Sequence, residues 1–393
     1  MTTQATITAP ARPIPLEESQ VGYRQLGSRF ACPIAATTPA GMPVRERSPY
    51  WDNARFAAIF LVIVGHATLK LISASDVAYS LYLFVYVFQV PAFVLVSGYF
   101  AKATPPGVPQ LKRLFTDLVV PYLIFETLWS GIHFCISGHL KLDYTTAWWT
   151  LWFLLALCIW RVVLPYLVIL RYPLLISVAL SVGAGYLSSF DDTFSLSRAV
   201  ALLPFFVLGW KLRQWNIADR WLSLRAGIVW RWRAGAIALF VGLAVVAAVG
   251  IVEWRHLLLR RFLLYDESYA SFGYAEWWAG ALRLGFIGLG ALCCFALLAL
   301  MPRGKTWFSG LGTRTMYIYL LHSLILYPIR QSGLLNGTTS VLVLVGMVAL
   351  SFGIAVVLGL PIVKRIFRPV VEPKLSWLFR HSQQDNRDAV QAT

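Results

Sequence analysis

The chain has 393 residues, of which 58% are hydrophobic and 13% are charged, and its mean hydropathy is +0.65. A soluble domain needs more charge than this to cover its surface, and repeated apolar runs of about 20 residues indicate membrane-spanning helices. The net charge is +16, but most basic residues lie in short segments between apolar runs, without a motif for reading or stacking on bases. The composition therefore predicts an all-α, polytopic integral membrane protein and argues against nucleic acid as a partner.

The cysteines give no sign of metal chemistry. They form no CxxC motif, and none lies near histidine at the spacing of metal ligands. Four of them fall in apolar segments, where small side chains pack between helices. We therefore predict no metal site. The five cysteines are Cys32, Cys135, Cys158, Cys293 and Cys294.

Residues 1–48 are rich in threonine, alanine and proline and lack helical periodicity, which predicts a disordered cytoplasmic tail. No apolar core follows a basic start there, so the segment does not read as a signal peptide. Residues 49–368 form the predicted transmembrane domain, and residues 369–393 a cytoplasmic C-terminal tail. We expect one bundle of ten spans, at residues 52–72, 80–101, 114–136, 148–170, 172–190, 199–213, 232–252, 277–300, 313–331 and 339–363. The sixth is short enough to be tilted or partly re-entrant.

The positions of the basic residues predict the orientation of these spans, because cytoplasmic connections carry an excess of lysine and arginine. With the N-terminus inside, the cytoplasmic connections hold most of the bases, and the opposite ones hold acids such as Asp143 and Asp266. Arg255, Arg260 and Arg261 run against this trend. The balance predicts a multi-pass protein of the cell membrane, inner or plasma, with both termini in the cytoplasm.

The first span carries two ionisable side chains, Arg55 near its start and His66 ten intervening residues later. Eleven helical steps make about three full turns, so both side chains lie on one stripe roughly 16 Å apart along the axis. Ionisable groups inside a membrane are costly and usually mark a polar path or a reaction site. The pair is therefore the first candidate for function.

Each member of this pair has a structural and a functional explanation. A neutral imidazole can take a proton from a hydroxyl, so His66 is a candidate general base, and otherwise a hydrogen-bonded core residue. Arg55 in the first turn works against the helix dipole and needs an anion nearby. That anion is Asp52, three residues earlier, or a lipid phosphate, or the phosphate of a cosubstrate arriving from the cytoplasm. Lys112 and Arg113, before the third span, either join Arg55 in an anion site or simply mark the cytoplasmic side.

Polar side chains on other spans predict a polar chamber inside the bundle that could receive an acceptor. Pro91 should kink the second span, and the Ser97–Gly98 pair is also explained by close helix packing. His322 is a second candidate base. The candidate chamber residues are Gln89, Ser97, Trp152, Arg198 and His322.

Several short motifs, in this order along the chain, resemble the membrane-bound acyltransferase-3 family, and most closely its branch of fucose 4-O-acetylase and related acetyltransferases. The resemblance covers about residues 50 to 330. The motifs are Asp52-Asn53-Ala54-Arg55-Phe56, Val64-Gly65-His66, Pro91 with Phe93, Ser97-Gly98-Tyr99, Val120-Pro121-Tyr122, Leu151-Trp152-Phe153-Leu154, Pro204-Phe205-Phe206-Val207-Leu208-Gly209 and Tyr317-Ile318-Tyr319-Leu320-Leu321-His322.

The resemblance implies transfer of an acyl group, usually acetyl from acetyl-CoA, to a hydroxyl of a carbohydrate or other cell-envelope molecule, without a tightly bound cofactor. Its marker is a basic residue, ten residues and a histidine, which Arg55 and His66 match. It implies that His66 is catalytic and that Arg55 binds or orients the donor. Some members carry two arginines, three apart, before the third span, where this chain has Arg113 and Thr116. Many have histidine at the position of Gln89, which cannot shuttle protons.

Two other classes of function remain open from the residues alone. Arg55 and His66 could form a proton or anion path in a transporter or exporter of a small envelope metabolite. A non-catalytic membrane scaffold explains the intramembrane ionisable groups less well. The sequence leaves open the acceptor, direct transfer versus an acylated His66, and the oligomeric state.

Overall fold

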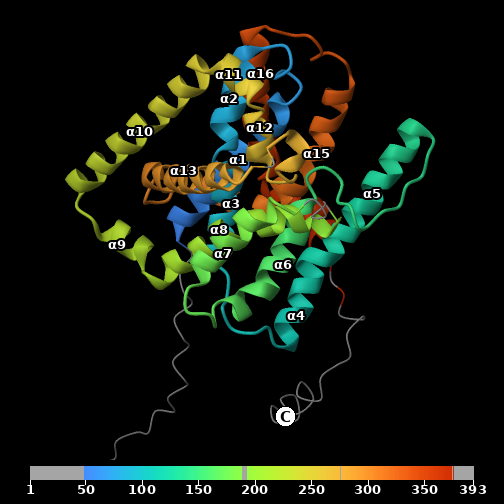
Figure 1. Cartoon of the computed structure of the whole chain (residues 1–393). Helices are drawn as coiled ribbons and strands as arrows, with labels where there is room; N and C mark the ends of the chain where they lie inside the picture. Colours follow the sequence, from blue (N-terminus) through green and yellow to red (C-terminus); the bar gives the residue numbers. More distant parts are fainter. Residues whose placement is uncertain (1–47, 188–192, 275, 374, 376–393) are drawn as a thin grey trace, which may run out of the picture. The chain divides into compact units, whose positions relative to one another are not determined.

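A computed structural model describes residues 48–187, 193–274, 276–373 and 375, and these are helical with no β-strand among them (Figure 1). The predicted all-α polytopic fold is confirmed. The predicted N-terminal tail, Ser48 apart, lies outside the described residues, as does most of the predicted C-terminal tail. Cys32 lies outside them as well.

Each of the ten predicted segments coincides with one or more helices. The first half of the chain forms α1 (Pro49–Thr68), α2 (Asp76–Tyr86), α3 (Gln89–Tyr99), α4 (Val108–Leu114), a π-helical turn (Phe115–Val119), α5 (Val120–Ser137), α6 (Trp152–Leu167) and α7 (Pro173–Ala184). The second half forms α8 (Leu196–Gln214), α9 (Ile217–Ser223), α10 (Ala226–Val249), α11 (Ile251–His256), α12 (Leu259–Leu264), α13 (Trp278–Leu300), α14 (Ser309–Gly312), α15 (Thr315–Gln331), α16 (Val341–Leu358) and α17 (Pro361–Val371). Short 3₁₀ turns cover Thr193–Ser195 and Ala270–Phe272.

Six helical stretches within the described residues are long and apolar enough to cross a membrane. They are Asp76–Tyr99, Val108–Ser137, Thr193–Gln214, Ala226–Val249, Trp278–Leu300 and Val341–Leu358. The helices α1, α6, α7 and α15 account for the other four predicted segments. The sixth segment, expected to be short, is a helical stretch of 22 residues, because the helix begins before the apolar run does.

Prolines lie where the helix boundaries differ from the predicted spans. The second span divides into α2 and α3 at Val87 and Phe88, which leaves Pro91 in the first turn of α3, where its missing N–H costs no helix hydrogen bond. The last predicted span, 339–363, ends earlier, at Leu358. Pro361 then starts α17, a helix that the sequence reading did not anticipate and that runs past residue 368.

Helices α3 and α8 cross at close range. A methyl group on Gly98 would collide with the backbone carbonyl of Phe206, and one on Gly209 would collide with that of Leu95. Two glycines therefore let the two backbones meet, as the Ser97–Gly98 pair predicted. This crossing fixes the start of α8, and with it Arg198, relative to the α2–α3 break.

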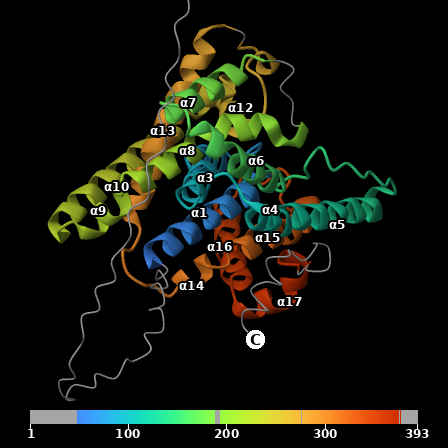
Figure 2. The same ribbon diagram turned by 90° about the horizontal axis from the view of Figure 1, so that it is seen from below.

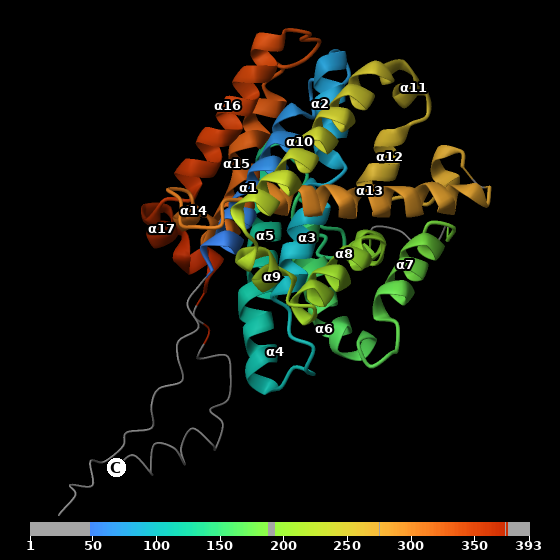
Figure 3. The same ribbon diagram turned by 90° about the vertical axis from the view of Figure 1, so that its left-hand side faces the viewer.

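The helix α1 lies inside the bundle. It packs against α2, α3, α14, α15 and α16, and most of its side chains are buried. Helices α5 and α10 lie at opposite edges of the bundle (Figure 1). The side chains of α10, such as Val241, Val245 and Val249, are exposed, as expected of a lipid-facing surface. Helices α15, α16 and α17 pack together beside α1 (Figure 3).

Candidate active site

The start of α1 is fixed by a buried amide. Asn53 Nδ2 donates to the carbonyl oxygens of Pro302 and Gly304, both at 3.0 Å. Asn53 Oδ1 accepts from Thr306 Oγ1 at 2.8 Å and from Ser309 Oγ at 2.7 Å. The short helix α14, which begins at Ser309, lies beside the start of α1 (Figure 2). All four hydrogen-bonding positions of this amide are used, so Asn53 anchors α1 to the segment before α15.

Arg55 lies one turn into α1 and is partly exposed. Its Nη1 is 3.0 Å from Asp52 Oδ1, the pair that the three-residue spacing predicted. The guanidinium carbon is 4.1 Å from the centre of the Phe100 ring, at the end of α3. A planar cation held between a carboxylate and a ring face keeps a fixed orientation.

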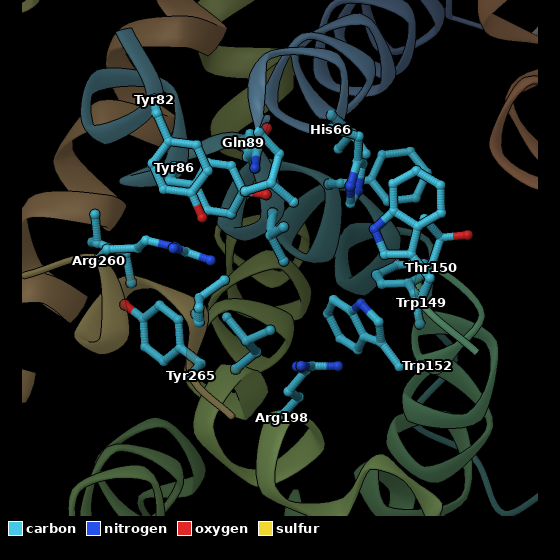
Figure 4. Close-up of a pocket in the computed structure, with 18 of the residues that line it drawn as sticks. His66, Tyr82, Tyr86, Gln89, Trp149, Thr150, Trp152, Arg198, Arg260 and Tyr265 are labelled. Carbon is cyan, nitrogen blue, oxygen red and sulfur yellow. The ribbon is translucent and has the colours of Figure 1, made fainter. Parts of the chain in front are cut away.

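The other end of α1 carries His66 in its last turn, and there it lines a cavity of about 150 Å³ (Figure 4). The walls come from α1, the α2–α3 break, the start of α6, the start of α8, α12 and α15. The polar and aromatic lining residues are His66, Tyr82, Tyr86, Gln89, Phe93, Trp149, Thr150, Trp152, Phe153, Arg198, Arg260, Tyr265 and Tyr319.

His66 has a second histidine beside it. The ring centres of His66 and His322 are 5.5 Å apart. His322 Nδ1 lies 2.6 Å from the carbonyl oxygen of Tyr319, which can only accept, so Nδ1 carries the proton and Nε2 has a lone pair. His322 Nε2 and His66 Nδ1 are both buried without a hydrogen-bond partner in the part of the chain that the structure describes. Two adjacent rings thus present one free acceptor and one nitrogen that can donate.

The loop between α5 and α6 closes one side of the cavity. The buried carboxylate of Glu126 accepts from the Trp148 N–H at 3.1 Å. Earlier in the loop, hydrogen bonds from the hydroxyl and backbone N–H of Thr145 lower the pKa of Asp143 to about 2. Trp149 then adopts a left-handed φ of 36°, which favours glycine. Two carboxylates therefore hold the loop immediately before a strained residue.

Trp149 faces His66 directly. Its ring meets the imidazole edge to face, with centres 5.2 Å apart. The guanidinium of Arg330, from α15, lies 4.3 Å from the centre of the same indole. These contacts show what holds the strained backbone of Trp149: its ring is packed between the histidine and a cation.

A glycine brings Gln89 and Tyr86 close to His66. A methyl group on Gly65 would lie within 2.8 Å of the Gln89 amide and of the Tyr86 ring. The space that Gly65 leaves lets the α2–α3 break approach α1 beside the histidine. Gln89 is buried, and none of the described residues forms a hydrogen bond with its Oε1.

Two arginines line the wall opposite His66 (Figure 4). Arg198 Nη2 is 2.7 Å from Asp266 Oδ2, and its guanidinium lies 5.3 Å from the centre of the Trp152 ring. Arg260 comes from α12, and its guanidinium lies 5.8 Å from the centre of the Tyr82 ring. No carboxylate lines the cavity within the described chain.

A comparison with models of protein families identifies the family of this chain. The family model described as an acyltransferase domain matches residues 48–360, from the start of α1 to the end of α16. The chain belongs to the acyltransferase-3 family. No curated protein and no solved structure gave a significant match.

This acyltransferase is a multi-pass membrane protein, and the family does not favour the transporter alternative. Its predicted site residues fall into separate places. Gln89, Trp152 and Arg198 line the cavity with His66, and His322 lies against His66. Arg55 lies toward the other end of α1.

The remaining predicted residues lie outside the cavity lining. Ser97 donates to the carbonyl oxygen of Phe93 at 2.8 Å, within its own helix. Lys112 and Arg113 lie on α4, none of whose residues is buried. In the part of the chain that the structure describes, no group of three histidine, cysteine, aspartate or glutamate side chains could hold a metal ion.

The sequence reading missed several residues of the acyltransferase cavity. Trp149 and Thr150 were assigned to a span, although they end a loop. The tyrosines of α2 have an ordinary helical spacing and give no signal. Arg260 did give one, because it stands among bases on a connection where few were expected. The missed lining residues are Tyr82, Tyr86, Trp149, Thr150, Arg260, Tyr265 and Tyr319.

Proposed function

We propose that this acyltransferase moves an acyl group, acetyl from acetyl-CoA, to a hydroxyl of a carbohydrate or other cell-envelope acceptor, with His66 as the general base. One observation carries the proposal. His66 lines the cavity, and its spacing from Arg55 resembles the basic residue, ten residues and histidine that mark the family. The sugar acceptor rests on the resemblance to fucose 4-O-acetylase and its relatives.

His66 performs the proton transfer. Its ring accepts the proton of the acceptor hydroxyl while the hydroxyl oxygen attacks the thioester carbonyl. The carbon–sulfur bond then breaks, the oxygen ester remains on the acceptor, and the coenzyme A thiolate takes the proton from the imidazolium. The ring ends neutral, and the free thiol of coenzyme A leaves.

His322 supports the base. We assign the resting proton of His66 to Nδ1, which would close a hydrogen bond to the lone pair of His322 Nε2 when the substrate binds, because neither nitrogen has a partner among the described residues and the ring centres are 5.5 Å apart. His66 Nε2 is then left unprotonated to receive the substrate proton. The protonated Nδ1 of His322, held by the Tyr319 carbonyl, supports this tautomer. His322 is then a positioning residue, in the way that a third group orients the base of a catalytic triad.

The donor approaches from the cytoplasm along α1. Arg55 at the start of the helix binds a phosphate of coenzyme A by exchanging its contact with Asp52, and Lys112 and Arg113 on α4 add positive charge on that side. The excess of bases on the predicted cytoplasmic connections supports this direction. Both termini are cytoplasmic in this proposal.

Transfer of labelled acetyl from acetyl-CoA in membranes tests the proposal. Wild type is compared with His66→Gln and with His256→Gln, a control on an exposed histidine of α11 outside the cavity. We expect His66→Gln to lower transfer by about 10²- to 10⁴-fold, the usual contribution of a general base, and the control to leave it unchanged.

Two results would overturn the proposal. One is full transfer by a folded His66→Gln variant. The other is flux of a metabolite without a covalent change, which would restore the transporter alternative.

A further inference from the structure

The arginines around the segment between α10 and α13 are paired one by one with acids. Arg255 Nη2 lies 2.9 Å from Asp76 Oδ1, and Arg261 Nη1 lies 3.7 Å from Glu267 Oε2. Asp266 of the same segment pairs with Arg198 of α8. Within the described chain these acids are used, and Arg260 has no ion pair.

Arg260 differs from its neighbours in where it points. Its side chain extends from α12 into the cavity, with the guanidinium near the ring of Tyr82, and Tyr265 lines the same part of the cavity (Figure 4). A cation that lines a partly enclosed, aromatic cavity without a counter-charge is unfavourable unless a ligand supplies one. The cavity therefore carries a positive charge that the protein itself does not balance.

Two hydroxyls accompany this charge. Tyr82 Oη, Tyr265 Oη and Arg260 Nε are buried and have no hydrogen-bond partner among the described residues, and all three residues line the same cavity. Buried donors are rarely left unused in a folded protein. Two hydroxyl donors and a guanidinium beside one another form a set that matches an oxyanion.

We infer that the acceptor is anionic, a hydroxyl compound whose carboxylate or phosphate binds Arg260, Tyr82 and Tyr265 while the hydroxyl to be acylated faces His66. The inference rests on the proposed function and names the substrate class of its site. The aromatic rings of Trp149 and Trp152, on the His66 and Arg198 sides of the cavity, suit the apolar face of a sugar ring.

The size and position of the cavity favour the acceptor over the donor as the source of this anion. A volume of about 150 Å³ is below the range of roughly 300–1,000 Å³ that larger ligands occupy, so the nucleotide half of coenzyme A does not fit. The phosphates of the donor are proposed to bind at Arg55, at the start of α1. Arg260 lies near the opposite end of that helix.

Protection of His66 from diethyl pyrocarbonate, followed by mass spectrometry on the purified full-length protein, tests the inference without requiring turnover. The probes are methyl β-glucuronide, methyl β-glucoside, inorganic phosphate and desulfo-coenzyme A. The first two differ only at C6 of the sugar, which is a carboxylate in the glucuronide and a hydroxymethyl group in the glucoside. The proteins are wild type, Arg260→Gln, Arg260→Lys and the control Arg255→Gln, whose arginine belongs to the same segment but is paired outside the cavity.

In wild type we expect the glucuronide to half-protect His66 at a concentration about tenfold lower than the glucoside requires. Inorganic phosphate should also protect His66. Arg260→Gln should remove both effects, Arg260→Lys should keep part of them, and Arg255→Gln should keep them fully. Because Arg260→Lys retains the charge, it decides the question if Arg260→Gln does not fold.

Three results would overturn the inference. They are equal protection by the two glycosides in wild type, a glucuronide preference that survives Arg260→Gln, and a loss confined to desulfo-coenzyme A, which would assign Arg260 to the donor. Loss of labelled acetyl transfer is a separate readout. Transfer that depends on His66 but shows no charge preference would leave the proposed function standing and remove only this inference.

Discussion

The polar side chains at the two ends of α1 differ in whether their hydrogen-bonding groups are paired. At the start, Asn53 uses all of its hydrogen-bonding positions, and Arg55 is paired with Asp52. At the end, His66 Nδ1, His322 Nε2 and Gln89 Oε1 are buried without hydrogen-bond partners among residues 48–187, 193–274, 276–373 and 375. The same helix is fixed to its neighbours at one end and presents unused polar groups at the other.

This contrast separates positioning from chemistry. Buried polar groups in folded proteins are nearly always paired, so a cluster of unpaired ones marks a place where something else is bound. A satisfied network at the start of α1 holds the helix in register. The unsatisfied cluster at its end is then available to a substrate. Variants at the two ends should therefore fail in different ways.

The largest effect is expected at the unsatisfied end. His322→Ala should lower acetyl transfer by about ten- to a hundredfold, because His66 loses the group that orients it, while the melting temperature changes little. His322→Gln, whose amide oxygen can still accept a proton from His66, should recover part of the rate. A shift in the pH–rate profile without a change in the acetyl-CoA KM would distinguish positioning from a packing defect. Transfer at the wild-type rate by His322→Ala would contradict the role.

At the satisfied end the expected loss is of stability. Asn53→Ala removes four hydrogen bonds and should destabilise the protein by about 2–4 kcal/mol, seen as a lower melting temperature in detergent. The folded fraction should still transfer acetyl at a near-normal rate per molecule. A stable Asn53→Ala protein that is inactive would mean that this end also takes part in the chemistry.

Arg55 tests whether the satisfied end has a second role. Arg55→Ala should raise the KM for acetyl-CoA about tenfold, because one charged hydrogen bond contributes about 1.5–3 kcal/mol and a partly exposed side chain gives the lower value. It should leave the KM for the acceptor unchanged. Arg55→Lys should be intermediate. An unchanged acetyl-CoA dependence would leave Arg55 with a structural role, through contacts such as those to Asp52 and Phe100.

The smallest effect is expected away from both ends. Lys112→Ala with Arg113→Ala should change the acetyl-CoA KM by less than about twofold at moderate salt, because α4 is exposed and its charges are screened. The effect should grow at low ionic strength. A salt-independent loss as large as that of Arg55→Ala would place these residues in direct contact with the donor.

The sequence was sufficient for the features that depend on local pattern. Apolar runs located the ten helical segments, and an imidazole inside such a run identified His66 as the first residue to consider. Asp52 and Arg55 were within reach of one another by helix spacing alone. Close helix packing was the simple explanation of serine beside glycine at 97–98, and the structure shows that α8 is the helix packed there.

Features that depend on distant contacts were not predictable in this way. Nothing in the local sequence of Asn53 indicates that residues 302–309 surround it. Arg260 becomes informative only when each neighbouring arginine is seen with its acid, which requires the fold. The helix α17 begins at Pro361, and a proline at that position separates it from α16. The apolar content of the chain gave no sign of this break, so the predicted span 339–363 ran across it.

The left-handed backbone at Trp149 has a consequence for the fate of the acyl group. Glu126 holds the N–H of Trp148, and the next indole covers one side of His66. An imidazole that activates a sugar hydroxyl can equally activate water, and the donor would then be hydrolysed to acetate. A bulky ring held over the base by an anchored loop denies water that position. In the proposed reaction, the strained position of Trp149 thus limits hydrolysis of the donor by water. A smaller side chain at this position should increase the release of acetate measured without acceptor.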